Sequence, residues 1–132
     1  MPDAIEVSDI ILAPPQQVYD AWLSGEQHAA MTGGDATCDA RVGGHFTAWD
    51  GYIEGECLEL TPPTRIVQSW RTSEFPDGAP DSRLEVSLAP TDDGRGTRIT
   101  LTHTNIPDGQ GRMYEEGWRE HYFTPMKGYF AP

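Results

Sequence analysis

The spacing of apolar residues divides the longer part of this chain, from residue 36 onward, into two regions. From about residue 36 to residue 104, apolar and polar positions alternate, and the clearest case sets Leu84, Val86 and Leu88 against polar neighbours. Strict alternation is typical of strands with one buried face. Short turn signals such as Asp50-Gly51 separate the alternating runs, so consecutive strands should pair antiparallel.

After residue 110 the spacing becomes helical. Apolar residues recur every four positions, which forms one broad stripe along a helix over residues 111–130: Tyr114, Trp118, Tyr122, Met126 and Phe130. Gly117 weakens this helix by roughly 1 kcal/mol relative to Ala. Pro125 lacks a backbone donor and its ring clashes with the carbonyl of His121, so we expect a kink there.

The first 35 residues predict one strand and two short helices. Residues 5–12 read as a strand whose alternation slips near Asp9, which would fit a bulge. Pro15 suits the first turn of a helix over residues 15–23. Ser24 is a good N-cap for a second short helix that ends at Met31.

These elements together predict an α+β helix-grip fold. Further strands are expected over residues 37–42, 45–50, 52–60, 65–71, 83–88 and 97–104. A curved antiparallel sheet of about six to seven strands would wrap around the long C-terminal helix, which covers its apolar face. Residues 1–132 are expected to form a single domain.

Net charge limits the partners. The formal charge is −12, with only nine Lys and Arg residues, so neither nucleic acid nor an anionic membrane surface is an expected partner. No signal peptide and no apolar run near the ~20 residues of a spanning helix is present, which favours the cytoplasm. There Cys38 and Cys57 would stay thiols, and a bridge between them has little support. Either a monomer or a homodimer fits the sequence.

Candidate binding residues are mostly aromatic. Four rings could either fill the core or line a cavity between sheet and helix: Trp49, Trp70, Trp118 and Tyr122. His103 shares a strand face with Ile99 and Leu101, so it should point to the concave side. It would be a polar anchor for a ligand, a general base, or a core histidine satisfied by a hydrogen bond.

Other polar residues carry less chemistry. Glu54 and Glu56 share a strand face, and a bulge near Cys57 would place both in solvent rather than pair them for acid–base work. The four histidines and two cysteines lack the spacing of a metal site. No phosphate-binding loop or nucleophile elbow is present, so we expect no cofactor, no metal and no catalytic residue set.

The order of elements and several local sequences resemble the START-like (SRPBCC) superfamily, and within it the activators of heat-shock-protein-90 ATPase. The resembling segments cover most of the chain: the helix Pro15 to Trp22, the turn Gly43-Gly44-His45-Phe46, the hairpin from Gly55 to Trp70, the strand Leu101 to Thr104 and the helix from Gly117 to Phe130. Each segment alone is only weakly specific for the family, but the order and spacing of all the segments together make the resemblance in fold fairly strong.

The resemblance implies a helix-grip fold that hosts several functions. We expect a non-enzymatic domain that binds a small apolar ligand, with Trp49, Trp70, His103, Trp118 and Tyr122 around it. One alternative is a regulator of a chaperone ATPase or another stress-related interaction protein, with a chaperone as partner. A second alternative is a cyclase- or hydrolase-like enzyme that uses His103. The activators that name the family carry a separate N-terminal domain, whereas this sequence begins at the first predicted strand, so a single-domain member is expected.

Overall fold

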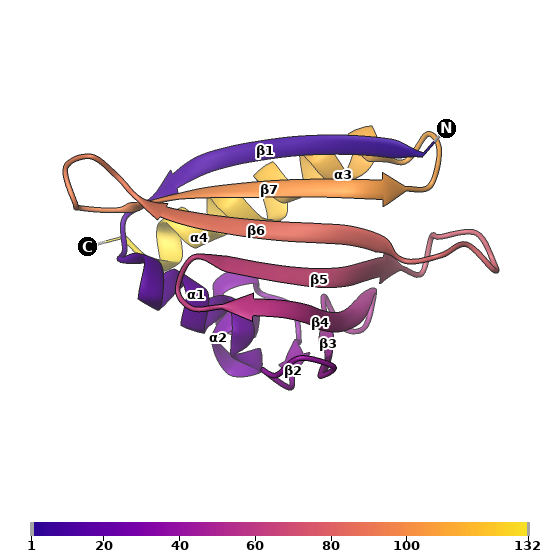
Figure 1. Ribbon diagram of the computed structural model, residues 1–132, viewed down its shortest axis with the longest axis horizontal. Helices are drawn as coiled ribbons and strands as arrows, with labels where there is room; N and C mark the ends of the chain where they lie inside the picture. The colour runs from indigo at the N-terminus through magenta and orange to yellow at the C-terminus, as the bar shows by residue number, and fades with distance from the viewer. Residues whose placement is uncertain (1, 132) are drawn as a thin grey trace.

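A computed structural model describes residues 2–131 and shows one seven-stranded antiparallel sheet (Figure 1). The strand order across the sheet is β1-β7-β6-β5-β4-β3-β2. The strands are β1 Asp3–Ile11, β2 Thr37–Cys38, β3 His45–Ala48, β4 Ile53–Thr61, β5 Arg65–Thr72, β6 Ser82–Pro90 and β7 Thr97–Ile106. Strands β2 to β7 follow one another in space as in sequence, which the short turns between them require.

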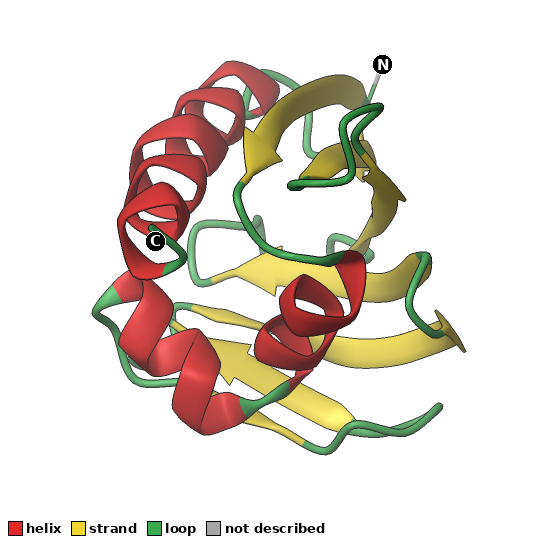
Figure 2. Ribbon diagram, turned by 90° about the vertical axis from the view of Figure 1, so that its left-hand side faces the viewer, coloured by secondary structure: helices red, strands yellow, loops and turns green. Residues whose placement is uncertain are grey.

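All helices lie on one side of the sheet (Figure 2). They are α1 Pro15–Leu23, α2 Gly25–Thr32 and a C-terminal run of α3 Gly111–Trp118, a π-helical turn η1 Arg119–Phe123 and α4 Thr124–Tyr129. Because α1 and α2 carry the chain from one sheet edge to the other, β1 pairs with the last strand, β7. The predicted α+β helix-grip arrangement is confirmed.

The C-terminal helix widens where its sequence demands it. The amide of Thr124 bonds to the carbonyl of Arg119, five residues back, which defines the π turn. A wider turn before Pro125 relieves the clash of the proline ring with His121, so the expected irregularity takes this form. Repeats of four residues also run ahead of a 3.6-residue turn, and the π turn restores the alignment of Tyr122 and Met126 with Trp118.

Polar contacts fix both ends of the helical layer. Ser24 caps α2 as predicted, since its hydroxyl accepts from the amide of Gln27 at 3.2 Å. The Asp3 carboxylate accepts from the amides of Gly109 and Gly111 at 3.0 and 2.8 Å, which ties the start of α3 to β1. Both contacts satisfy donors that a helix N-terminus leaves free.

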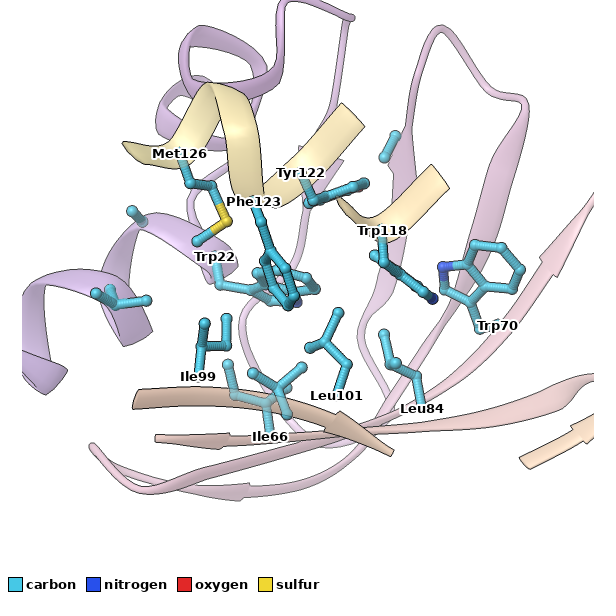
Figure 3. Packing of buried hydrophobic residues seen from close by; sticks show 14 of the residues in the cluster. Trp22, Ile66, Trp70, Leu84, Ile99, Leu101, Trp118, Tyr122, Phe123 and Met126 are labelled. Atoms are coloured by element: carbon cyan, nitrogen blue, oxygen red, sulfur yellow. The ribbon is translucent and has the colours of Figure 1, made fainter. Parts of the chain in front are cut away.

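The inward faces of sheet and helices form one core (Figure 3). Leu84, Val86 and Leu88 are buried on β6, which confirms the alternation seen in the sequence. The register of β4 shifts between Cys57 and Glu59, and Glu54 and Glu56 are exposed. The predicted bulge near Cys57 and the exposure of both carboxylates are therefore confirmed.

The bulge predicted near Asp9 was wrong. The pairing of β1 with β7 is continuous from Ile5 to Ile11, and the irregularity lies between Asp3 and Ile5 rather than near Asp9. Asp9 stays in register because its carboxylate meets the Lys127 ammonium at 2.7 Å, so a polar residue occupies a position that the alternation reserves for an apolar one.

The strand expected over residues 37–42 ends at Cys38. Beyond it the chain forms tight turns, in which the amide of Arg41 bonds to the carbonyl of Asp39 and that of Gly44 to the carbonyl of Arg41. A Cβ on Gly44 would lie 2.0 Å from the carbonyl oxygen of Asp39, so this turn depends on glycine.

Candidate functional site

A half-open cavity of about 550 Å³ lies between the C-terminal helix and the β3–β4 end of the sheet. Its walls come from three regions: the β3–β4 turn and the start of β4, Trp70 on β5, and one face of α3 and η1. The lining residues are Trp49, Tyr52, Ile53, Trp70, Met113, Tyr114, Glu116, Gly117, Trp118, Glu120, His121 and Tyr122. Six of these residues carry Trp or Tyr rings, so the lining is chiefly aromatic.

The inner wall is a cluster of buried rings. Trp70 lies against Trp118, with ring centroids 5.4 Å apart, and against Tyr114 at 4.9 Å. Trp118 and Tyr122 project from the helix toward the sheet, one helical turn apart (Figure 3), with centroids 4.8 Å apart. Tilted and edge-to-face packing of this kind holds each ring in place, so the inner wall is preformed.

Trp49 forms the outer wall, and its backbone is strained. Its φ of 53° lies in the left-handed region, which large side chains rarely adopt and which costs on the order of 1–3 kcal/mol. Asp50 secures this turn, because its amide bonds to the carbonyl of Asp35 and its carboxylate accepts from the amide of Asp35. As a result the half-buried Trp49 ring packs against the His121 ring in a T-shaped arrangement, with ring centroids 5.7 Å apart, and both residues line the cavity.

Gly117 keeps the helix side of the cavity open. It lies in the interior of the C-terminal helix with an ordinary φ, and an added Cβ would meet no atom within 4 Å. No backbone or packing requirement therefore explains a residue that costs roughly 1 kcal/mol relative to Ala. Since Gly117 lines the cavity, any side chain there would occupy part of its volume.

His103 is placed on the concave side as expected, but it does not reach the cavity. Its side chain is 0% exposed. The indole N–H of Trp118 donates to its Nδ1 at 3.2 Å, so the ring proton sits on Nε2 and is donated to Ser82 Oγ at 2.8 Å. The Ser82 hydroxyl in turn donates to the carbonyl of Trp70. Burial lowers the pKa of His103 to about 3, so the ring is neutral near pH 7.

His28 is a second buried histidine, and no pattern in the sequence pointed to its role. Its Nδ1–H donates to the carbonyl of Trp22 at 3.0 Å, and its Nε2 accepts from the hydroxyl of Tyr122 at 2.7 Å. Burial lowers the pKa of His28 and raises that of Tyr122. This pair anchors the polar end of Tyr122 in the core, so the face of its ring can line the cavity.

A hydrogen-bonded loop closes another side of the cavity. The Tyr52 hydroxyl donates a hydrogen bond to the carboxylate of Glu74. Burial, and to a smaller extent this hydrogen bond, raises the pKa of Tyr52. Tyr114 donates to the side chain of Gln110 at 2.8 Å and is paired with the hydroxyl of Thr72 at 2.7 Å. The loop after β5 is thereby held against the start of α3.

Four of the five residues predicted for the site thus line one cavity: Trp49, Trp70, Trp118 and Tyr122. The fifth, His103, lies behind Trp118 and Trp70. The sequence did not single out Tyr52, Tyr114 or Gly117. Tyr114 belonged to the recognised helical stripe, and Gly117 was visible as an unfavourable residue in a helix.

Other site types find no support within residues 2–131. No group of three His, Cys, Asp or Glu side chains could hold a metal ion among these residues. None of the helices described is long and apolar enough to cross a membrane. Cys38 and Cys57 are both free, and the neighbouring Cys38 thiol lowers the pKa of Cys57.

Residues 12–131 match the family described as "Activator of Hsp90 ATPase homolog 1-like protein", and the chain belongs to this family of START-like proteins. Among its relatives, the human activator of 90 kDa heat shock protein ATPase homolog 1 is 29% identical over 127 residues, which cover 96% of this chain and 37% of the human protein. The chain spans about a third of the length of the curated relatives it matches.

Solved structures share the fold. An HSP90 activator from Plasmodium falciparum superposes with a TM-score of 0.87 at 25% identity, covering 96% of this chain and 94% of that one. CalU16 from Micromonospora echinospora gives a TM-score of 0.80 at 24% identity, covering 99% of this chain and 78% of that one. The predicted family and fold are both confirmed.

Proposed function

We propose that this protein is a non-enzymatic domain that binds a small, flat, mainly apolar molecule in the cavity between the sheet and the C-terminal helix. The observation that carries the proposal is Gly117, a helix-interior glycine whose only evident consequence is open space in an aromatic cavity. Residues that cost stability without a structural reason are expected where function requires them.

The size and lining of the cavity fit this role. A volume of about 550 Å³ falls within the range of roughly 300–1,000 Å³ that small-molecule sites occupy. Trp70, Trp118 and Tyr122 offer a rigid inner wall, and Trp49 and Tyr52 offer half-buried rings at the mouth. Flat apolar ligands gain most from such walls, because ring contacts combine area burial with stacking.

His103 contributes to this site by positioning other residues. Its Nδ1 accepts from Trp118, and its partner Ser82 bonds to the backbone of Trp70. Being enclosed and neutral, it offers no proton to a ligand in the cavity. This arrangement supports binding over the hydrolase- or cyclase-like alternative, which needs His103 at an open surface.

The test is a titration with the neutral fluorescent probe N-phenyl-1-naphthylamine. Wild-type protein should enhance the probe's fluorescence with saturable binding, and Gly117→Leu, whose side chain would occupy part of the cavity, should weaken binding at least tenfold. Gly128→Leu is the matched control, because Gly128 also lies in the C-terminal helix with no neighbour within 4 Å but does not line the cavity. Equal binding by all three proteins would refute the proposal.

Family membership favours a second function, regulation of a chaperone ATPase in the cytoplasm, with the chaperone as partner. It is supported by the match of residues 12–131 to the activator family and by the similarity to the human activator along 96% of this chain. The test is the ATPase rate of purified Hsp90 with and without an excess of this protein. A several-fold increase would support the role, and an unchanged rate together with no complex on a sizing column would exclude it.

A further inference from the structure

The ionisable groups at the cavity mouth are nearly all acidic. Glu116 and Glu120 both line the cavity, and Glu74 holds the hydroxyl of the lining residue Tyr52. The lining contains no lysine or arginine, and its one histidine is His121. An anionic head group placed at this mouth would face carboxylates of its own sign.

The two arginines on the C-terminal helix leave this negative field largely in place. Arg119 pairs with Glu115 at 3.2 Å, away from the cavity lining. Arg112 approaches Glu116 only at 4.0 Å, and its side chain is 91% exposed, so water screens this pair strongly. Among residues 2–131, no salt bridge is seen for Glu120.

The walls add attraction of the same sign. The faces of Trp and Tyr rings carry negative potential and attract organic cations, an effect that grows when water is excluded. Trp49 and Tyr52 contribute half-buried rings to the same cavity lining as Glu116 and Glu120, so a bound cation could meet both a ring face and a carboxylate. The net charge of −12 extends this preference beyond the site.

From the acidic mouth and the aromatic walls, we infer that the cavity selects a flat aromatic or alicyclic molecule that bears a positive charge, such as a protonated amine or a quaternary ammonium group. This inference rests on the proposed function, because it specifies the ligand class of the same cavity. The apolar body would lie against Trp70 and Trp118, and the cationic group would remain at the mouth.

The test compares three probes that share one ring system and differ in charge. They are 1-naphthylmethylamine, which is a cation at neutral pH, the neutral 1-naphthalenemethanol and the anionic 1-naphthoate. Isothermal titration at low salt should give the amine an affinity about 3- to 30-fold above that of the alcohol. The carboxylate should bind more weakly than the alcohol.

Two variants locate the origin of the preference. The double variant Glu116→Gln/Glu120→Gln should bring the amine close to the alcohol while leaving the affinity for the alcohol within about twofold. Glu115→Gln removes a charge from the same helix but not from the cavity lining. Glu26 lies in the first turn of α2, also outside the lining, so a Glu115→Gln/Glu26→Gln double variant matches the change in net charge. This control should retain the preference for the amine.

The outcomes separate the two claims. Equal affinities for all three probes, or the tightest binding by 1-naphthoate, would overturn the inference while leaving the cavity as a binding site. A preference for the amine that the control double variant loses equally would also overturn it, because net charge alone would then explain the effect. Absence of binding by all three probes, with no response to N-phenyl-1-naphthylamine, would overturn the proposed function itself.

Discussion

The indole N–H of Trp118 donates to Nδ1 of His103 at 3.2 Å, in a part of the core that water does not reach. This one contact joins the C-terminal helix to β7, next to the edge strand β1, and sets the orientation of a ring that lines the cavity. It also fixes the tautomer of His103, since an indole nitrogen can only donate.

Replacing His103 by Leu should destabilise the fold by about 2 kcal/mol, because the buried N–H of Trp118 loses its acceptor. Urea unfolding measures this loss. His45→Leu is the control, since His45 is exposed on β3 and its replacement should change stability by less than about 0.5 kcal/mol. A His103→Leu protein as stable as wild type would show that the buried contact contributes nothing.

Stability should fall as the pH is lowered from about 6.5 toward 5. Burial lowers the pKa of His28, and that of His103 to about 3, whereas both residues in the unfolded chain titrate near 6.5. The unfolded state therefore binds more protons below pH 6.5, which favours unfolding.

Each histidine then contributes up to about 1.4 kcal/mol per pH unit. The lowered pKa values of Asp9 and Glu85 add their effect only nearer pH 4, so the window from 6.5 to 5 isolates the histidines. Urea unfolding curves at pH 7 and pH 5 provide the measurement. A free energy of unfolding that stays constant over this range would contradict the buried neutral state of both rings.

Gly117→Ala should stabilise the protein by up to about 1 kcal/mol, since the helix gains a better former and the new methyl group meets no neighbour. Gly128→Ala should also raise the stability for the same reason. Its effect should be similar or smaller, because Gly128 lies closer to the end of the helix. Thermal unfolding compares the two. If only Gly117→Ala destabilised the protein, the space beside Gly117 would be smaller than the structure shows.

Trp49→Ala should weaken the binding of N-phenyl-1-naphthylamine about tenfold. Stacking of a flat ring on one aromatic side chain contributes on the order of 1–3 kcal/mol to binding. The cost of this substitution to stability should be modest, since Trp49 is half-buried and Ala relieves part of the strain at a φ of 53°. Fluorescence titration and urea unfolding of the same sample separate the two effects. Unchanged affinity would remove Trp49 from the site.

The sequence predicted those parts of the fold that local chemistry decides. Alternation located β6, the Ser24 hydroxyl located the start of α2, and four-residue spacing located the C-terminal helix. It missed the features that depend on a distant partner. Asp9 interrupts the alternation of the first strand, and the sequence therefore predicted a bulge there. Its partner in the structure, Lys127, lies far away in the chain, so local spacing could not reveal the ion pair. The π turn, by contrast, has local causes in Pro125 and the four-residue repeat, and the sequence predicted the irregularity but not its form.

The candidate site was predicted to the same extent. Period and ring size identified Trp70, Trp118 and Tyr122, because large inward side chains must meet where a sheet wraps a helix. The position of His103 on the inner face was also readable, but its enclosure by Ser82 and Trp118 required the register of β6 against β7. Gly117 was recognisable in the sequence as an unfavourable helix residue, but its place beside an open cavity was evident only from the structure.

The four tryptophans can report directly on whether the cavity beside Gly117 binds a small molecule. The indole N–H signals in a ¹H–¹⁵N NMR spectrum can be followed while 1-naphthalenemethanol is added. Trp49, Trp70 and Trp118 line the cavity, whereas Trp22 does not and donates its N–H to Gln68 at 3.1 Å. We expect saturable shifts for the three cavity tryptophans, a much smaller shift for Trp22, and binding at least tenfold weaker in Gly117→Leu. No shifts in wild type, or equal shifts for all four that persist in Gly117→Leu, would contradict this expectation.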